Sequence, residues 1–441
     1  MASVVKMPLA RRDARALGRP PLRILLSAYA CEPKRGSEPG IGWQWATRLA
    51  ELGHEVHVIT RESNREAIAS AYSANPIPTL HFTYLDLPKW ARFWKRGNRG
   101  VHLYYFLWQW RSLSVARALH ARVRFDVVHH ITFGVFRQPS LLGQLGVPFI
   151  FGPVGGGERA PRSLRRSLPF RHRMSEWARD AANAYAKVDP LLRIGLRRAS
   201  RILCKTEETR RSLPHAYRSQ GELFLEIGTE PDPSHHPPAH IVGPEPKHPG
   251  SLRILFVGRL VHMKGLHLAL PAFARLFETF PGSQFTIVGS GQQEHELRLL
   301  AAQLGIYHRI EWLSWMTHES VMALYPDYDV FLFPSLHDSS GNAVLEAMSC
   351  GLPVVCLNLG GPAAIVDSFS GITIEATEQD ETVRQLGDAL LLLARRPQLR
   401  AYLARGAQNR ASNYFSWRNQ VDRMNTLYYE VQDNVSTRRT Q

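Results

Sequence analysis

The first half of the chain alternates short apolar runs with stretches that repeat at a helical period. Leu22 begins the run LRILLSAYA, and a Gly-rich loop and the amphipathic stretch IGWQWATRLAELG separate it from a second apolar run, HEVHVITR. Short apolar runs bounded by Gly, Pro or charge predict strands, and the periodic stretch between them predicts a helix. This order indicates a βαβ unit with two parallel strands and a right-handed crossover.

Similar apolar runs recur in two series, which a segment without periodicity separates. The first series continues over residues 125–132, 147–154 and 201–206. The second series covers residues 252–258, 284–291, 329–335 and 352–358, with helical patterns between its members. Such repetition predicts an α/β protein with two doubly wound, Rossmann-like domains that face each other across a cleft.

Changes in composition suggest the boundaries of these domains. Residues 230–250 are dense in Pro and His and lack periodicity, which predicts a linker. The start of the chain is basic and without an apolar run, which predicts a mobile tail. The predicted units are a tail over residues 1–20, an N-terminal domain over 21–229, the linker over 230–250, a C-terminal domain over 251–414, and a helix and tail over 415–441.

Composition and charge narrow the range of partners. Hydrophobic residues make up 44% and charged residues 21% of the 441 positions, which excludes wholesale disorder. Lys and Arg number 54 against 38 Asp and Glu, and the net charge of +16 favours anionic partners such as phosphorylated substrates or anionic lipid. Because no helix-turn-helix, RNA-recognition or finger pattern occurs, we expect no nucleic-acid partner.

The cysteines and the apolar runs indicate a compartment. The four cysteines form no short CxxC pair and lack His-rich partner spacing, which argues against a disulfide framework and a zinc site. No stretch approaches the roughly 18 apolar residues of a spanning helix, and the first residues lack the apolar run of a signal peptide. We therefore expect a cytoplasmic protein without a spanning helix.

Two cations follow the first strand of the second domain. Arg259 and Lys264 lie in VGRLVHMKGL, a predicted strand-to-helix loop. Open α/β sheets bind ligands at the carboxyl ends of their strands, and an Arg and a Lys there would hold a diphosphate. They would also stabilise the charge on a departing nucleoside diphosphate. The alternative is a pair of solvated surface cations.

A second motif, SLHDSSGNAVLEAMSCGLPVV, follows another strand of the same domain. It places Asp338 eight residues before Glu346, on either side of the sequence GNAV. Amides at the start of a helix can donate to phosphate or sugar oxygens, and carboxylates accept hydrogen bonds from sugar and ribose hydroxyls. The alternative is an acid favoured by the helix dipole at Asp338 and an acid at the edge of the core at Glu346.

These motifs together resemble the retaining nucleotide-sugar glycosyltransferases of family four, which have the GT-B fold. The resemblance extends from Leu22 to about Tyr429 and is most specific over residues 257–265 and 334–361. In that family two Glu residues, separated by seven others, contact the donor. Here Asp338 replaces the first of them, which shortens its reach by one methylene, and Glu346 keeps the second.

The resemblance assigns roles to the second motif. It implies that Glu346 holds the donor ribose. It also implies that Asp338 faces the sugar and diphosphate together with the residues that follow it, Gly341, Asn342, Ala343 and Val344. Arg259 and Lys264 would then act on the leaving group.

Two glycine loops of the first domain complete the resemblance. ACEPKRGSEPGIGW is similar to the family's loop that faces the donor diphosphate, and Gly40 and Gly42 would let backbone amides approach phosphate at a helix start. The alternative is that these glycines only make a turn. FGPVGGGE, over residues 151–158, makes a second loop that would shape the acceptor side or serve as a flexible connection.

A histidine near the reacting sugar is expected from the segment DVVHHITFG. The family often carries two histidines there with one residue between them, and the second position is Ile131 in this chain. His130 is therefore the catalytic candidate, one position early. His129 is predicted to be a hydrogen-bonded core histidine, because alternate strand residues face opposite sides.

The activity that the resemblance implies is transfer of a sugar from a nucleoside-diphosphate sugar to a saccharide or lipid-linked acceptor. The implied pathway is cell-surface polysaccharide, such as lipopolysaccharide or exopolysaccharide, or glycolipid biosynthesis. No metal and no other cofactor is expected, because no DxD motif stands in the donor loops. Two alternatives stay open: a nucleotide-sugar epimerase or sugar phosphorylase of the same fold, and a non-enzymatic basic protein that binds anions.

Aromatic residues and cations alternate in one segment of the first domain. Residues 89–111, KWARFWKRGNRGVHLYYFLWQWR, interleave Trp, Phe and Tyr with Lys and Arg, and residues 159–173 add a basic run. Such a surface suits peripheral contact with an anionic membrane, here the inner face of the cytoplasmic membrane. The alternative is a helix with core aromatics and solvated cations.

Overall fold

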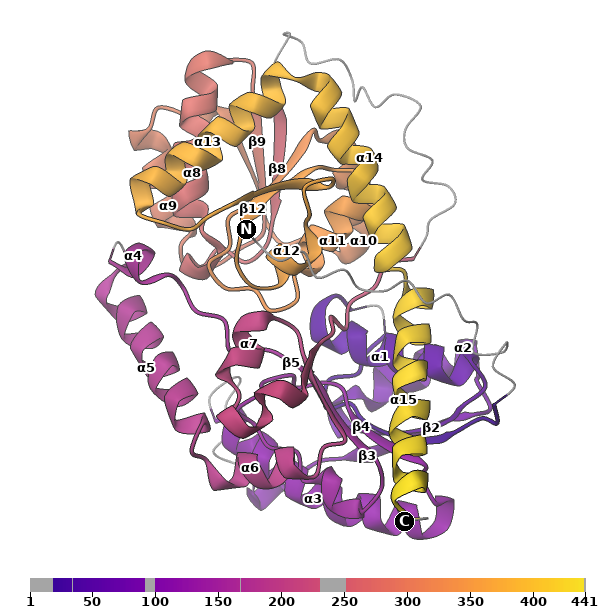
Figure 1. The fold of residues 1–441 in the computed structure, drawn as a ribbon. Helices are drawn as coiled ribbons and strands as arrows, with labels where there is room; N and C mark the ends of the chain where they lie inside the picture. Colours follow the sequence, from indigo (N-terminus) through magenta and orange to yellow (C-terminus); the bar gives the residue numbers. More distant parts are fainter. Residues whose placement is uncertain (1–18, 34, 92–99, 167, 231–250, 440–441) are drawn as a thin grey trace.

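The computed structural model describes residues 19–33, 35–91, 100–166, 168–230 and 251–439. Nearly all of the predicted tail (residues 1–20) and of the predicted linker (residues 230–250) lies outside these ranges. Within them the chain forms two α/β domains, one above the other in Figure 1.

The first domain contains a seven-stranded sheet in the order β3-β2-β1-β4-β5-β6-β7. Every pair of neighbouring strands is parallel. The strands are β1 (Arg23–Ser27), β2 (Glu55–Arg61), β3 (Leu80–Leu85), β4 (Val127–His130), β5 (Phe149–Val154), β6 (Arg201–Cys204) and β7 (Gly221–Leu223). The predicted runs contain β1, β2, β4, β5 and β6, and the pairing of β1 with both β2 and β4 makes the sheet doubly wound.

The second domain repeats this plan with a six-stranded parallel sheet in the order β10-β9-β8-β11-β12-β13. Its strands are β8 (Arg253–Val257), β9 (Gln284–Val288), β10 (Ile310–Leu313), β11 (Val330–Phe333), β12 (Val354–Leu357) and β13 (Gly371–Ile374). The central strands β11 and β12 are buried along their whole length, as continuous apolar runs of a parallel sheet require. The predicted α/β fold with two Rossmann-like domains is confirmed.

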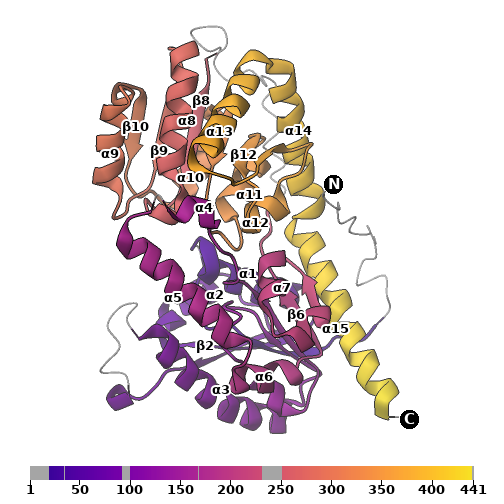
Figure 2. The same cartoon turned by 60° about the vertical axis from the view of Figure 1, so that its left-hand side comes forward.

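Helices cover both faces of each sheet (Figures 1 and 2). In the first domain they are α1 (Ser37–Glu51), α2 (Arg65–Ala74), α3 (Val101–Val123), α4 (Arg162–Arg165), α5 (Phe170–Ala186), α6 (Pro190–Arg197) and α7 (Glu207–Ser212). In the second they are α8 (Leu266–Thr279), α9 (Glu294–Gln303), α10 (His318–Leu324), α11 (Asn342–Ser349), α12 (Gly360–Ile365), α13 (Gln379–Arg395) and α14 (Pro397–Tyr414). None of the helices in the described ranges is both long enough and apolar enough to cross a membrane.

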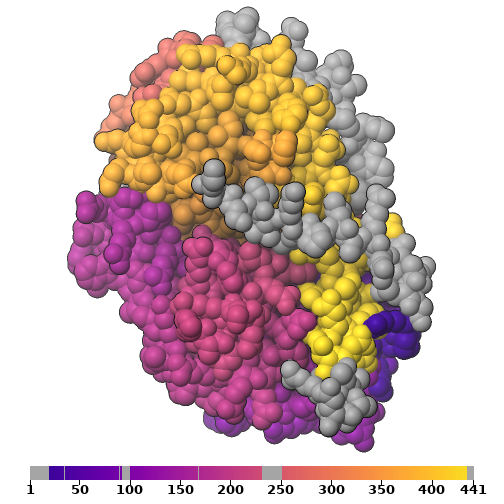
Figure 3. Space-filling model, in the orientation of Figure 1, coloured from indigo at the N-terminus to yellow at the C-terminus, as the bar shows by residue number. Residues whose placement is uncertain are grey.

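The last helix, α15 (Trp417–Arg439), returns to the first domain. In Figure 3 its yellow atoms lie against the lower domain, next to the indigo start of the chain. The amide of Gln420 donates to the backbone oxygens of Leu225 and Ile227 at 3.0 and 2.7 Å. This helix therefore fastens the end of the second domain to the first.

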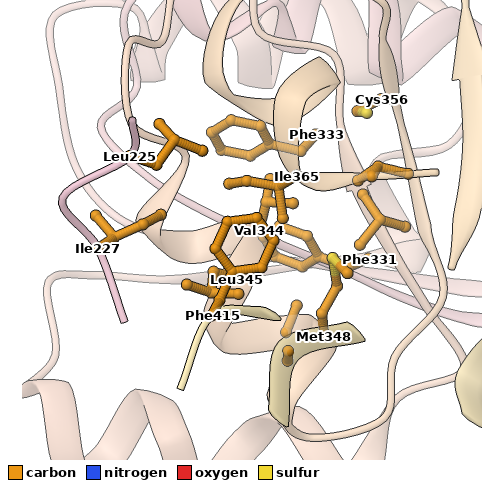
Figure 4. Packing of buried hydrophobic residues seen from close by; sticks show 14 of the residues in the cluster. Leu225, Ile227, Phe331, Phe333, Val344, Leu345, Met348, Cys356, Ile365 and Phe415 are labelled. Atoms are coloured by element: carbon orange, nitrogen blue, oxygen red, sulfur yellow. The ribbon is translucent and has the colours of Figure 1, made fainter. Parts of the chain in front are cut away.

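Apolar packing joins the two domains beside this helix. Figure 4 shows that Leu225 and Ile227, from the end of the first domain, lie beside Val344 and Leu345 of α11. Phe415, between α14 and α15, belongs to the same cluster. Because buried apolar side chains leave little space between them, this cluster fixes the position of α11 relative to the first domain.

A buried hydrogen bond anchors α15 to the central strand β4. The Nε2 atom of His129 lies 2.7 Å from the carbonyl oxygen of Gly152, and its Nδ1 lies 2.6 Å from the hydroxyl of Tyr428. A carbonyl can only accept, so Nε2 carries the proton and Nδ1 accepts from the tyrosine. Burial lowers the pKa of His129 to about 4, so the ring is neutral at pH 7.

Tyr428→Phe tests this anchor. We expect the free energy of unfolding to fall by about 1–3 kcal/mol, because the substitution leaves the Nδ1 atom of His129 buried without a donor. Denaturant unfolding measures the change. Tyr402, which is 47% exposed, supplies the control, since Tyr402→Phe should change stability by less than about 0.5 kcal/mol. Equal stability of the two variants would contradict the anchor.

Candidate active site

A cavity of 520 Å³ lies between the two domains. Its walls are the loop before α1 and the first two turns of that helix, residues 227–229, and the first turns of α10 and α11. The first turns of α10 and α11 come from the second domain, which makes the cavity a shared site. Such interdomain clefts are where α/β enzymes commonly bind their ligands.

Glu346 reaches this cavity from α11. One carboxylate oxygen accepts a hydrogen bond from the hydroxyl of Tyr325 at 3.2 Å, and the other lies 3.0 Å from Nε2 of His318. The hydrogen bond to Glu346 raises the pKa of His318 above its usual value. A fixed carboxylate that borders the cavity can accept hydrogen bonds from ligand hydroxyls.

Asp338 forms an ion pair with Lys264, with 2.5 Å between the carboxylate oxygen and Nζ. Its other oxygen accepts from the backbone amides of Ser340 and Gly341 at 3.2 and 2.8 Å. Burial raises the pKa of Asp338, but Lys264 and these amides outweigh burial and hold the pKa below its usual range. Asp338 therefore shapes the turn before α11 and keeps Lys264 beside it.

The first turn of α11 presents backbone amides next to this ion pair. Asn342, Ala343 and Val344 begin the helix, and the amides of a first turn have no acceptor within the helix. Val344 is fully buried, so its side chain belongs to the core. Gly341 precedes the helix at a φ of 75°, a conformation that glycine adopts without strain.

Arg259 lies in the loop after β8 and is exposed. It makes no hydrogen bond or ion pair with another described residue, whereas Lys264 is half-buried and paired with Asp338. The structure thus brings Lys264, Asp338 and the start of α11 together. It leaves the guanidinium of Arg259 available at the carboxyl end of the sheet.

The glycines of the first loop differ from the expectation. Helix α1 begins at Ser37, so Gly40 and Gly42 lie within the helix and not before it. Gly40 borders the cavity, and its amide is among the first four of the helix. Gly42 lies in the second turn, where a Cβ would collide with the carbonyl oxygen of Ala30. Gly42 therefore serves close packing of the helix against the loop, and its amide is not available to phosphate.

The structure does not bring His130 to the cavity. Its side chain is 1% exposed and lies among Tyr105 and Phe151, with the Tyr105 hydroxyl 3.4 Å from the ring nitrogens. Burial lowers its pKa to about 3. His129 and His130 point to opposite faces of β4, and both faces of this parallel sheet are covered, so both rings are buried. His129 is a hydrogen-bonded core histidine as predicted, and His130 is a core histidine too.

Polar residues that the sequence analysis did not single out join the two domains. The buried carboxylate of Glu158 accepts from the hydroxyl of Ser339 at 2.9 Å. Lys205 forms a buried ion pair with Glu226, and Ser340 donates to the same Glu226 oxygen at 2.8 Å. Ser339 and Ser340 lie between Asp338 and Gly341, so the first domain holds the loop that precedes α11.

The neighbours of Lys205 and Glu158 stabilise the charged forms of both side chains. Burial lowers the pKa of Lys205, but Glu226 outweighs burial and the pKa is raised, so the lysine is charged. Burial likewise raises the pKa of Glu158, while hydroxyl donors from Thr206, Thr209 and Ser339 bring it below its usual value. No local pattern in the sequence points to these residues, because the partners lie on separate elements far apart in the chain.

Comparisons with known proteins agree with this architecture. The family described as "Glycosyl transferases group 1" matches residues 242–410, and "Glycosyl transferase 4-like domain" matches residues 40–220. D-inositol 3-phosphate glycosyltransferase of Saccharomonospora viridis is 34% identical over 188 residues, 40% of this chain and 42% of that protein. The chain thus spans about two fifths of the length of the curated relatives it matches.

Solved structures show the same fold at low identity. The catalytic domain of starch synthase IV from Arabidopsis thaliana, bound to ADP and acarbose, has a TM-score of 0.65 at 14% identity and covers 94% of this chain and 100% of its own. WaaG, a glycosyltransferase involved in lipopolysaccharide biosynthesis, has a TM-score of 0.55 at 18% identity, with 88% and 95% covered.

Two parallel-sheet domains that share a cleft at the carboxyl ends of their strands define the GT-B class of α/β proteins. Within that class, the second half of the chain matches the glycosyl transferases group 1 and the first half matches the glycosyl transferase 4-like domain, so both halves are similar to glycosyltransferases.

Lys205→Met tests the buried ion pair of the first domain that Ser340 of the second domain contacts. We expect the free energy of unfolding to fall by about 3–5 kcal/mol, because Glu226 is 2% exposed and would keep an unpaired charge. Denaturant unfolding at pH 7 measures the loss. Lys187→Met, at a half-buried lysine without an ion pair to another described residue, is the control and should change stability by about 0.5 kcal/mol or less. A loss below about 1 kcal/mol for Lys205→Met would show that the pair is not required.

Proposed function

We propose that this protein is a retaining glycosyltransferase that moves a sugar from a nucleoside-diphosphate sugar to a saccharide or lipid-linked acceptor. One observation carries the proposal. Glu346 and Asn342 of α11 border a cavity that residues of both domains line, and Lys264 is paired with Asp338 just before this helix, at the carboxyl ends of the second sheet. This set supplies acceptors for hydroxyls and donors for phosphates at one place.

In this proposal some of these residues bind the donor and others stabilise the leaving group. Glu346 accepts hydrogen bonds from the donor ribose, and the amides of Asn342, Ala343 and Val344 donate to the diphosphate. Lys264 and Arg259 stabilise the negative charge that grows on the departing nucleoside diphosphate. Asp338 keeps Lys264 and the turn in position.

Catalysis then depends on positioning. The first domain holds the acceptor so that its hydroxyl approaches the sugar from the face on which the diphosphate leaves. The departing phosphate accepts the hydroxyl proton, so the anomeric configuration is retained. No protein nucleophile is needed, and the rate enhancement comes from orientation and charge stabilisation.

The proposed pathway is cell-surface polysaccharide or glycolipid assembly, at the inner face of the cytoplasmic membrane. A lipid-linked acceptor would require contact with a lipid surface, and one face of the protein suits it. Helix α5 carries an exposed apolar stripe, with Phe170 73%, Trp177 65% and Tyr185 62% exposed. Arg171 and Arg173 are exposed beside it. In Figures 1 and 2 this helix runs along the outer flank of the molecule.

Residues 89–111 are the segment that the sequence suggested for this contact, and the described side chains in it are partly buried and partly exposed. Residues 92–99 lie outside the described ranges. On α3, Tyr104, Tyr105 and Trp108 are buried in the core, whereas Trp110 is 65% exposed. The proposed membrane surface therefore rests on α5, and the buried aromatics of α3 serve the fold.

Donor binding is tested by thermal unfolding with UDP, GDP, ADP and their sugars. A ligand at a hundred times its dissociation constant adds about 2.7 kcal/mol of stability, and we expect this shift with one diphosphate. Glu346→Gln should weaken the shift without loss of folding. Arg259→Ala and Lys264→Ala should lower turnover at least about a hundredfold.

Arg395→Ala, at an exposed cation of α13 in the same domain, is the matched control and should keep full turnover. Unchanged turnover in both Arg259→Ala and Lys264→Ala would contradict the assignment. Product analysis separates the alternatives, because an epimerase or a phosphorylase would not form the acceptor-linked product from a nucleotide sugar. A folded protein that no diphosphate stabilises would favour the basic anion-binding protein.

Membrane contact is tested with vesicles of phosphatidylglycerol and phosphatidylcholine. We expect flotation with the anionic vesicles, and the double variant Phe170→Ser, Trp177→Ser should lower the bound fraction at least about fivefold, because it removes the apolar anchor. Phe369→Ser is the control, since Phe369 is 60% exposed on the second domain. Equal binding of the double variant and the control would contradict the α5 surface.

A further inference from the structure

Three potential metal ligands lie at the end of the first sheet that faces away from the cavity. Glu55 and His57 are on β2, and His81 is on β3. Glu55 is the first residue of its strand, whereas the cavity lies at the carboxyl ends of the strands. The proposed transferase site makes no use of these side chains.

Strand geometry brings the three side chains together. Glu55 and His57 are two residues apart on one strand, so both point to the same face of the sheet. His57 and His81 are register partners of the parallel pair β2–β3, and their ring centroids are 4.6 Å apart. One ligand atom from each residue lies within 4.8 Å of the others.

In this cluster the His57 ring is held by its neighbours, whereas Glu55 and His81 are accessible to solvent. The side chain of His57 is 12% exposed, packs edge-on against Phe125, and lies 2.9 Å from the Glu55 carboxylate. Glu55 is 42% exposed and His81 is exposed, so solvent reaches the group. A fixed imidazole beside two adjustable ligands suits capture of an ion from solution.

The charges beside the cluster also suit a cation. The Glu55 carboxylate supplies a negative charge to the group. Arg23, the register partner of Glu55 on β1, is neutralised by two contacts to Asp126 at 3.1 and 2.9 Å. The nearby guanidinium therefore opposes a bound cation only weakly.

We propose that Glu55, His57 and His81 bind one divalent transition metal ion of the Zn²⁺ class. Two imidazoles and one carboxylate are a ligand set that Zn²⁺ takes, with water in the fourth position. Tetrahedral bonds of about 2.1 Å bring ligand atoms to roughly 3.4 Å from one another. Side-chain rotation of the exposed Glu55 and His81 closes the remaining gap.

Such an ion would join an edge strand to the interior of the sheet. Among the strands that the structure describes, β3 is the last on its side of the sheet and pairs with β2. An ion held by His81 on β3 and by Glu55 and His57 on β2 would cross-link these strands. Because it would bind the folded state, it would raise the melting temperature and slow hydrogen exchange in β3.

Titration calorimetry with ZnCl₂ tests the site on the full chain after dialysis against a chelator. The chain contains 19 histidines, so variants decide the location. We expect one equivalent bound with an affinity that falls at least about tenfold in His57→Gln and in His81→Gln. His215→Gln, at an exposed histidine of the same domain, should bind as the wild type does. Unchanged affinity in His81→Gln, or no binding by the wild type, would overturn the proposal.

Hydrogen exchange gives a second readout that does not depend on affinity alone. Zn²⁺ should protect amides of residues 80–85 in the wild type and in His215→Gln, but not in Glu55→Gln, whose charge loss on an exposed side chain leaves folding intact. Protection in Glu55→Gln equal to that in the wild type would count against the three-ligand site.

Discussion

The contact between two buried carboxylates of the first domain and a serine pair of the second fixes the geometry of the cleft. Glu158 accepts from Ser339, and Glu226 accepts from Ser340 while paired with Lys205. Buried charge is tolerated only when it is paired and hydrogen-bonded. A shift of one domain against the other would remove partners from these buried charges at a high cost in free energy, so the groups keep the two domains in register. The turn before α11 thereby has a single position.

The functional groups depend on that turn and on the apolar packing behind it. Asp338 begins the turn and the amides of α11 follow it, while Leu225 and Ile227 of the first domain lie beside Val344 and Leu345 of the helix (Figure 4). Glu346, one turn further along the helix, is oriented by Tyr325 and His318. A rigid polar contact and a close-packed core thus hold the same short helix.

The cavity, the group of potential metal ligands and the exposed apolar stripe lie at different places on the first domain. The carboxyl ends of its strands meet the second domain at the cavity, and the amino ends carry the group of Glu55, His57 and His81. The apolar stripe of α5 lies outside both. This separation follows from the parallel sheet, since parallel strands gather loops of one kind at each edge. Changes at one of these places can therefore leave the others intact.

By itself the sequence determined the elements and motifs that are local in the chain. Buried parallel strands are continuous apolar runs, so β8, β11 and β12 could be predicted, and so could the segment from Asp338 to Glu346. Gly42 was misplaced because a helix start shifts by single residues without a clear signal in the pattern, and His130 was misplaced because helices cover both faces of the parallel sheet. Only the tertiary structure decided the pairing of Lys205 with Glu226, the meeting of His57 with His81, and the return of α15 to the first domain. Those contacts depend on strand register and domain packing, which join residues that no local pattern connects.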